Sequence, residues 1–302
     1  MGQGESASSR SEGHQPTLLP SDWRYTIENL AVERRLITIN KDQYRFGHEL
    51  GSGAFGAVYS ARNVPANKQV AIKVVSLVTF SSREAEMLAQ SILTEIEMSK
   101  RLARASSHVV NMYDFDFHRQ SGLAFLVMEL GEKDLEKTLK ERQRIPAVER
   151  KELWRQFVNI AMALHNHKIV HLDIKPQNLV VFPGNRVKLV DLGIAQKAYK
   201  HRVGSNGTWL YSAPEVANVP RNHTMLNTSK ADVWSWGAVL YRITYLVPPR
   251  YVHPSHHPPK NVPPSRDANL VDVLRHTLVL DPRERADPIW LSRHPYTTTS
   301  SA

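Results

Sequence analysis

The feature that most constrains the fold is a change of pattern partway along the chain. Between positions 44 and 130 the sequence is dense in β-branched and aromatic residues, which is typical of strands, in the segments YRFGHEL, AVYSARN, QVAIKVV, VVNMYDF and LAFLVMEL. One helical segment, 84–103, interrupts them, with apolar residues at Met87, Ile92, Ile96 and Met98. The first part of the chain therefore predicts a sheet accompanied by one helix.

After position 146 the pattern becomes mostly helical. Leu153, Phe157, Ile160 and Leu164 follow the 4-3-4 spacing of one helix face, and 231–246 is a second apolar helical segment. The strand-like segments IVHLDI, LVVF and VKLVDLG lie between these helices. We therefore expect an α+β fold in two lobes, a small β-rich N-terminal lobe and a larger, mainly helical C-terminal lobe.

The composition narrows the class of protein. A chain of 302 residues suits one large domain or two packed lobes. The absence of cysteine excludes disulfides, thiolate metal sites and a thiol nucleophile. No apolar run approaches the roughly 18 residues of a membrane span, and the N-terminus lacks the apolar core of a signal peptide. We therefore expect an intracellular chain, in the cytoplasm, the nucleus or both, without stable membrane insertion.

The charge balance is basic, with 39 Lys and Arg against 29 Asp and Glu and a net charge of +10. Charges of both signs alternate in segments such as EKDLEKTLKERQR over 132–144, which favours a solvated helical face. An attraction for acidic partners or substrates is the alternative interpretation. A nucleic-acid partner is not expected, because no basic run with interleaved aromatic residues is present.

The first twenty residues are polar and rich in Ser and Gly, which predicts disorder. Their start, MGQGES, matches the pattern for N-myristoylation at Gly2, with Ser6 in the required place. A single acyl chain would give only marginal, reversible membrane binding.

A glycine-rich stretch, GSGAFGAVY over 51–59, lies between two strand-like segments. Gly51, Gly53 and Gly56 would let backbone amides approach phosphate oxygens closely, although a glycine-rich hairpin turn explains the same pattern. The next strand carries Lys73 in VAIK, among apolar neighbours where a lysine needs an anionic partner. Lys73 therefore either faces solvent on an edge strand or meets a phosphate and a carboxylate.

A second polar cluster lies in HLDIKPQNLVV, which begins at residue 171. It places an acid, a base and an amide (Asp173, Lys175 and Asn178) within eight residues, just before an apolar run. Taken singly, Asp173 could cap a turn and Asn178 could cap a helix. Taken together with Lys73 and with Asp191 in VDLG, these separate capping roles are disfavoured.

Five motifs in a fixed order carry a resemblance to the eukaryotic protein kinases: GxGxxGxV, VAIK, HLDIKPQN, VDLG and APE. The resemblance covers residues 44–297. It implies an N-terminal extension at 1–43, an N-lobe at 44–128, a hinge at 129–131, a C-lobe at 132–297 and a tail at 298–302. It also implies ATP and Mg²⁺ as co-substrate and cofactor, and proteins as substrates; no oligomeric state follows from it.

The resemblance implies a role for each motif residue. The nucleotide would contact Gly51, Ser52, Gly53, Gly56, Val58, Ala71, Lys73, Met128, Glu129 and Gly131. Lys73 would hold the α and β phosphates and pair with Glu95, which is favoured over its neighbour Glu97. Asp173 would accept or orient the substrate hydroxyl proton, and Lys175 would neutralise charge on the transferred phosphoryl group. Asn178 and Asp191 would bind magnesium.

Further positions fit the same pattern. The resemblance implies an ion pair between Glu215 and Arg285, and an anchor for the catalytic loop at Asp232. Two positions depart from it. Leu172 stands where many kinases have an arginine that pairs with activation-loop phosphate, so the usual mode of activation is not expected. Leu192 replaces a phenylalanine, which exchanges one apolar residue for another.

The segments VVNMYDFDF, LVMELGEKDLEKTLK and ERKELWRQFVNIAMALHNHKIVHLDIKPQNLVV are similar to those of the monopolar-spindle (TTK) dual-specificity kinases. That group implies action on Ser and Thr, on Tyr in some settings, and a role in mitotic checkpoint signalling. The chain departs from the group at PPRYVHPSHHPPKNVPPSR, over 248–266. The histidines in this tract have no cysteine or carboxylate beside them, so we expect a solvated loop and no metal site at His253, His256 and His257.

Two other functions compete with an active protein kinase. A pseudokinase that serves as a binding module or scaffold is disfavoured, because Lys73, Asp173, Asn178 and Asp191 are all present. A small-molecule kinase is disfavoured by Lys175 and by GTWLYSAPE, where Thr208 resembles the residue that contacts the catalytic aspartate of Ser/Thr kinases. In the segment from Asp191 to Glu215, Tyr199 and Ser205 remain as candidate regulatory acceptors.

Overall fold

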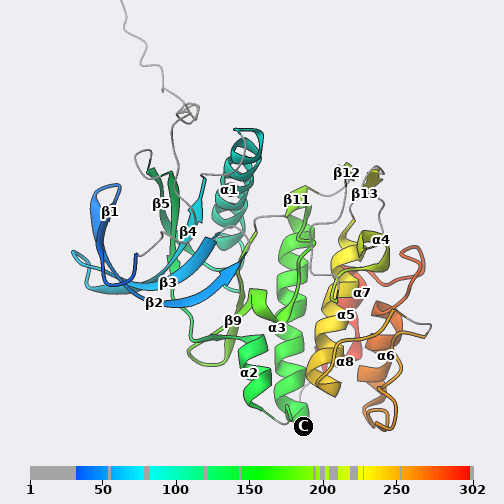
Figure 1. Cartoon of the computed structure of the whole chain (residues 1–302). Coiled ribbons are helices and arrows are strands. Elements are labelled where there is room, and N and C mark those ends of the chain that lie inside the picture. The colour runs from blue at the N-terminus through cyan, green and yellow to red at the C-terminus, as the bar shows by residue number, and fades with distance from the viewer. Residues whose placement is uncertain are drawn as a thin grey trace, which may run out of the picture.

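The structure is a computed structural model that describes residues 32–53, 56–77, 82–118, 122–142, 144–192, 195–197, 201–203, 210–217, 224–226, 228–251 and 254–299. Two lobes lie side by side in it (Figure 1), a sheet with one long helix and a bundle of helices. The predicted α+β architecture with a β-rich first lobe and a helical second lobe is confirmed.

The small lobe is a six-stranded antiparallel sheet with strand order β1-β2-β3-β4-β6-β5. Its strands are β1 (Leu36–Ile39), β2 (Asp42–Gly53), β3 (Gly56–Asn63), β4 (Lys68–Ser76), β5 (Met112–His118) and β6 (Leu123–Glu129). The burial of β3 alternates from residue to residue, as expected for a strand with one face on the core. Helix α1 (Ser82–Ala103) covers the other face, where Ile92 and Ile96 join Val75 and Leu126 in a shared apolar cluster.

The small lobe begins before Tyr44. Strand β1 pairs with the first half of β2, and Val32 and Ile39 are buried in the same cluster as Phe46 and Phe125. Position 44 therefore lies inside β2, after a strand that already belongs to the sheet. The segment LITI is short and half exposed, which is why its pattern did not stand out as a strand.

The large lobe is built on helices α2 (Leu135–Glu141), α3 (Ala147–Asn166), α4 (Pro214–Ala217), α5 (Ser229–Tyr245), α6 (Ala268–Thr277), α7 (Pro288–Arg293) and α8 (Pro295–Thr298). The chain between and around these helices also forms short strands: β7 (Lys133–Asp134), β8 (Ile169–Val170), β9 (Leu179–Phe182), β10 (Arg186–Leu189), β11 (Gln196–Lys197), β12 (His201–Val203) and β13 (Thr224–Leu226). They form three small sheets, β10-β9-β7, β11-β8 and β12-β13.

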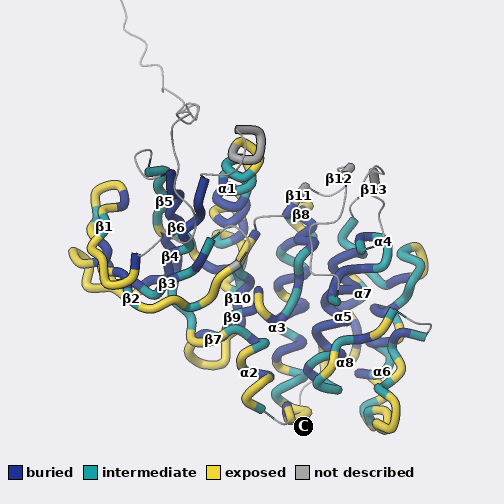
Figure 2. Tube along the Cα trace, in the orientation of Figure 1, coloured by how far each residue is buried: buried dark blue, intermediate teal, exposed yellow. Residues whose placement is uncertain are grey.

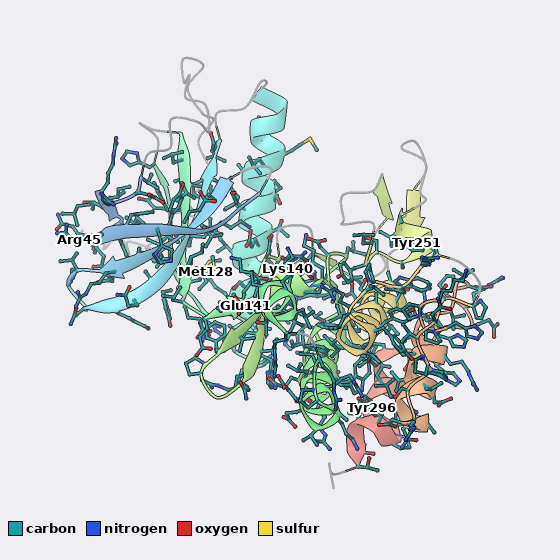
Figure 3. All side chains as sticks on the ribbon, turned by 60° about the horizontal axis from the view of Figure 1, so that its bottom comes forward. Arg45, Met128, Lys140, Glu141, Tyr251 and Tyr296 are labelled. Carbon is teal, nitrogen blue, oxygen red and sulfur yellow. The ribbon has the colours of Figure 1, made fainter. Side chains whose placement is uncertain are left out.

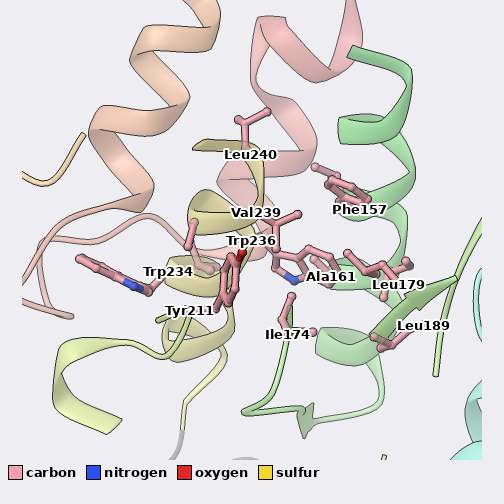
Figure 4. Close-up of a cluster of buried hydrophobic side chains, with 14 of the residues drawn as sticks. Phe157, Ala161, Ile174, Leu179, Leu189, Tyr211, Trp234, Trp236, Val239 and Leu240 are labelled. Carbon is pink, nitrogen blue, oxygen red and sulfur yellow. The ribbon is translucent and has the colours of Figure 1, made fainter. Parts of the chain in front are cut away.

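Helix α5 runs through the centre of the large lobe and is buried along most of its length (Figure 2). Trp236 stacks on Phe157 of α3 with ring centroids 5.5 Å apart, and both lie in the core drawn in Figure 4. Gly237 faces α6, where an added Cβ would lie 2.2 Å from the hydroxyl oxygen of Thr277. Glycine at this position therefore lets α5 and α6 pack closely together.

The segment 132–144 is only partly a solvated face. Asp134 caps α2 by accepting a hydrogen bond from the Lys137 backbone N–H at 2.8 Å. Leu135 and Leu139 are buried, and Glu136 accepts a hydrogen bond from Arg242 of α5 at 3.2 Å. The alternation of charges in the sequence conceals this buried side of the helix.

No described residue between α5 and α6 is helical, which agrees with the Pro-rich departure seen in the sequence. Across the described part of the chain, no helix is long and apolar enough to cross a membrane. The expectations at Gly2, Tyr199, Ser205, Thr208 and His253 fall outside the described residues.

Candidate active site

Lys73 on β4 meets carboxylates from both lobes. Its Nζ atom donates to Glu95 of α1, at 2.8 Å to Oε2 and 3.1 Å to Oε1. The same atom donates to Oδ1 of Asp191 at 3.0 Å. Of the two alternatives left by the sequence, the lysine therefore meets carboxylates and does not simply face solvent.

Charge stabilises this arrangement. Burial alone would lower the pKa of Lys73, but the carboxylates of Glu95 and Asp191 raise it above its ordinary value, so the lysine stays charged. Glu95 is only 4% exposed, whereas Glu97 on the same helix is exposed. Among the two candidate glutamates, Glu95 is the one that contacts Lys73.

The second polar group lies in the loop between β8 and β9. The carboxylate of Asp173 is 2.7 Å from Lys175 Nζ. The side-chain NH₂ group of Asn178 donates to the Asp173 carboxylate at 3.0 Å and to its carbonyl oxygen at 2.8 Å. The acid, base and amide noted in the sequence therefore form one cluster.

Asp232 of α5 holds the loop between β8 and β9 by hydrogen bonds to its backbone. Its two carboxylate oxygens accept the backbone N–H groups of His171 and Leu172 at 2.7 and 2.8 Å. Burial raises the pKa of Asp232 to about 7, against the lowering effect of these two donors. Leu172 has φ of 67° and is 3% exposed, so its side chain is a core residue and its unusual backbone conformation is fixed by Asp232.

The glycine-rich stretch closes a hairpin between β2 and β3, in which Gly53 pairs with Gly56. An added Cβ at Gly56 would lie 2.0 Å from the backbone carbonyl oxygen of Val74, so only glycine fits beside β4. At Gly51 an added Cβ would meet nothing within 4 Å, and Ser52 beside it is exposed. The hairpin and phosphate-loop interpretations are therefore compatible.

Met128 lies where the sheet meets the large lobe (Figure 3), and it belongs to a cluster of apolar side chains. Ala71 and Met128 are buried and Val58 is partly buried in one cluster with Leu130 and, from the large lobe, Val180. An added Cβ at Gly131 would lie 2.3 Å from Val180 Cγ1, so the segment between β6 and β7 passes closely over β9. A flat apolar ring would find partly exposed apolar atoms from both lobes here.

The sequence did not single out Val180 or Lys188. Lys188 on β10 is buried and donates to Glu129 Oε1 at 2.6 Å. The same oxygen accepts the backbone N–H of Asn111 at 2.7 Å, so Glu129 is held at the end of β6. The signal was available, because Lys188 lies in the apolar run VKLV just as Lys73 lies in VAIK.

Asn178 and Asp191 suit a magnesium ion that keeps part of its water shell. Among the described residues no group of three or more His, Cys, Asp or Glu side chains could form a protein-only metal site. Mg²⁺ is usually held by one or two carboxylates together with substrate phosphates and water. The backbone N–H of Val190 donates to the Asn178 carbonyl oxygen at 3.0 Å, which ties the segment before Asp191 to Asn178.

The supporting positions also meet in the structure. Arg285 donates to both carboxylate oxygens of Glu215, at 2.7 and 2.9 Å, and its side chain is fully buried. Leu192 is buried in the core of the large lobe, in keeping with an apolar residue at that position.

Comparison with known proteins places these features in a family. The model of the protein kinase domain matches residues 44–297. The chain is 31% identical over 284 residues to the mouse dual specificity protein kinase TTK. This match covers 86% of the present chain and 32% of the mouse protein. The zebrafish Ttk is 30% identical, covering 93% of this chain and 29% of that protein.

The probable serine/threonine-protein kinase mps1 of Dictyostelium discoideum is 30% identical to this chain. The match covers 82% of this chain and 27% of the Dictyostelium protein. The chain thus spans at most about a third of the length of these three relatives. The family model, by contrast, covers most of the chain, and the chain belongs to the protein kinase domain family.

Proposed function

We propose that this chain transfers the γ-phosphate of ATP to Ser and Thr residues of proteins. The observation that carries the proposal is the position of Lys73, bonded at once to Glu95 of the small lobe and to Asp191 of the large lobe. This arrangement holds α1 against the sheet and brings the expected phosphate-binding and metal-binding groups together, which phosphoryl transfer requires.

Each remaining residue would have a limited task. Asp173 would orient the substrate hydroxyl and receive its proton, while Lys175 beside it would offset negative charge on the transferred group. Asn178 and Asp191 would hold Mg²⁺, which when bound offsets charge on the β and γ phosphates. Both described bonds of the Asn178 side chain use its NH₂ group, so its Oδ1 atom can serve a cation.

Specificity and biological role are the finer part of the proposal. The relatives are named as dual specificity or serine/threonine kinases, which supports Ser and Thr as acceptors, and Tyr in some settings. The same resemblance supports a role in mitotic spindle checkpoint signalling, in the cytoplasm, the nucleus or both. Comparing the phosphoproteome of cells that carry the wild type or Asp173→Asn would identify the pathway.

One assay separates the kinase from a pseudokinase binding module. The full chain is incubated with Mg²⁺, γ-labelled ATP and a basic acceptor protein, with the Asp173→Asn variant as the control. We expect label on Ser and Thr of the acceptor, lost when Mg²⁺ is chelated. Wild-type label no higher than that of the variant would favour the binding module.

A further inference from the structure

A groove on the large lobe has none of the residues assigned to phosphoryl transfer in its described lining. It has a volume of about 600 Å³ and lies between the end of α5, the segment that follows it and Leu210. Most of its lining is apolar or aromatic and comes from Leu210, Tyr241, Val247, Tyr251 and five prolines. A volume of this size accommodates one or two large side chains of a peptide.

Hydrogen bonds and ring stacking hold the groove in shape. The Tyr251 hydroxyl donates to the carbonyl oxygen of Ser212 at 2.5 Å, and its ring stacks on Trp234 with centroids 5.8 Å apart. On the other side, the Tyr241 hydroxyl donates to the His257 carbonyl oxygen at 2.7 Å. Pro248 and Pro249 restrict the backbone between Tyr241 and Tyr251, so this part of the wall is formed before a ligand binds.

The charge at the rim has one sign. Arg250 and Lys260 line the groove and are exposed, and none of its described lining residues is acidic. Neither cation takes part in a salt bridge with a described residue. An acidic ligand would therefore gain attraction without first breaking an ion pair within the described part of the chain.

The groove is continuous with the end of the activation segment. Leu210 lines it directly, and Tyr251 is bonded to Ser212, three residues before Glu215 of the APE motif. A segment bound here would be tethered beside the part of the kinase that receives the acceptor. Tethering raises the effective concentration of the acceptor without changing the chemical step.

We propose that this groove docks a short acidic segment of the protein substrate, with a bulky apolar side chain as its anchor. The effect of docking on phosphate transfer rests on the proposed function, whereas the binding of the segment can be measured without turnover. It predicts that binding depends on negative charge around the anchor and on Arg250 and Lys260.

Binding is tested first, with two fluorescein-labelled twelve-residue peptides that share a central Leu-Phe pair. One carries Glu on both sides of the pair and the other carries Lys. We expect the full chain to prefer the Glu peptide, and the double variant Arg250→Glu/Lys260→Glu to bind it at least about tenfold more weakly. The variant should in turn bind the Lys peptide better than the wild type does.

The control variant is Arg275→Glu/Arg293→Glu, which makes the same change of charge at exposed positions outside the groove. It should bind the Glu peptide as the wild type does. Equal weakening by both double variants would reduce the effect to net charge and overturn the proposal. So would a wild type that sediments as a dimer and becomes monomeric only in Arg250→Glu/Lys260→Glu, because the groove would then be a self-interface.

Turnover is tested second, with a Ser-containing acceptor peptide made with and without the Glu-flanked Leu-Phe extension. Docking predicts a lower KM for the extended peptide at unchanged kcat, and loss of that difference in Arg250→Glu/Lys260→Glu. An inactive wild type would contradict the proposed function while leaving the binding result standing. Normal activity with no preference in either assay would overturn the docking proposal alone.

Discussion

At the scale of single residues, the site depends on charged groups placed where water is scarce. Lys73 and Lys188 lie in apolar strands, and each meets a glutamate of the small lobe, Glu95 or Glu129. The sequence led to the first pair because a family motif marks Lys73. It did not lead to the second, because no family motif marks Lys188 in VKLV, and its partner 59 positions away is brought to it only by the fold.

His171 gives a pH-dependent prediction. It is fully buried, and burial lowers its pKa from the ordinary 6.5. The unfolded chain binds a proton at this histidine below about pH 6.5 while the folded chain does not, so the residue lowers stability as the pH falls. We expect His171→Phe, compared with the wild type, to lose less stability between pH 7 and pH 5, by up to about 1.4 kcal/mol per pH unit.

Urea unfolding at several pH values measures this difference. The variant loses the bond in which the Asp173 N–H donates to His171 Nδ1 at 3.2 Å, so it should be less stable at neutral pH. The informative quantity is therefore the slope against pH. Parallel curves for the two proteins would show that His171 takes up its proton equally in the folded and the unfolded chain, and would contradict the lowered pKa.

At the scale of elements, the fold was largely predictable from pattern. The expected strands from YRFGHEL to LAFLVMEL and the helix at 84–103 are present, because alternation and helical spacing reflect burial directly. The pairing of β12 with β13 was not predictable, since it joins two segments of three residues each, too short to carry a pattern of their own. The φ of 67° at Leu172 was also hidden, because leucine gives no sign of a left-handed backbone.

Helix α1 provides a matched pair of glutamates. Glu95 is buried against Lys73, whereas Glu97 two positions later is exposed. We expect Glu95→Gln to lower kcat/KM by about tenfold to a hundredfold, since Lys73 loses the charge that orients it, equivalent to about 1.4–2.8 kcal/mol in the barrier. Glu97→Gln should remain within about twofold of the wild type, a change of under roughly 0.5 kcal/mol.

Steady-state kinetics with purified proteins, each shown to be folded by circular dichroism, decide this point. Equal losses in the two variants would mean that the helix needs its net charge and not the specific contact. A larger loss in Glu97→Gln would move the partnership with Lys73 to that residue, against the geometry described above.

At the scale of the whole molecule, one buried arginine joins several segments of the large lobe. Arg285 donates to Glu215 and to the carbonyl oxygens of Val279 and Lys230, and lies over the Trp234 ring. Arg285→Leu leaves the Glu215 carboxylate without its cationic partner, so it should lower the free energy of unfolding by about 3–5 kcal/mol. Arg283→Leu, two positions away and 87% exposed on its side chain, should leave the melting temperature unchanged.

Differential scanning calorimetry of both variants tests this contrast. A drop for Arg285→Leu that Arg283→Leu does not share confirms that the buried ion pair stabilises the lobe. Comparable melting temperatures for Arg285→Leu and the wild type would contradict it.

The activation segment leads to a prediction about regulation. Leu172 is an uncharged residue buried in the core, so it cannot pair with a phosphate. The end of the segment is held instead by the hydrogen bond from the Tyr251 hydroxyl to the Ser212 carbonyl oxygen. We expect activity without phosphorylation in this segment, and Ser205→Ala combined with Tyr199→Phe should keep most of it. An inactive double variant, together with loss of wild-type activity after phosphatase treatment, would show that phosphate is required.

In the proposed function, residues from both lobes take part in one chemical step, and Asp173→Asn tests that assignment most directly. Asparagine has nearly the same shape as aspartate, and its amide oxygen can accept the Asn178 hydrogen bond that the carboxylate accepts, so the variant should remain folded. We expect its kcat for phosphate transfer to fall by about 10²–10⁴-fold, because the group that receives the proton is lost. A purified, folded Asp173→Asn protein that retains more than about a tenth of wild-type kcat, a barrier change below roughly 1.4 kcal/mol, would contradict the account.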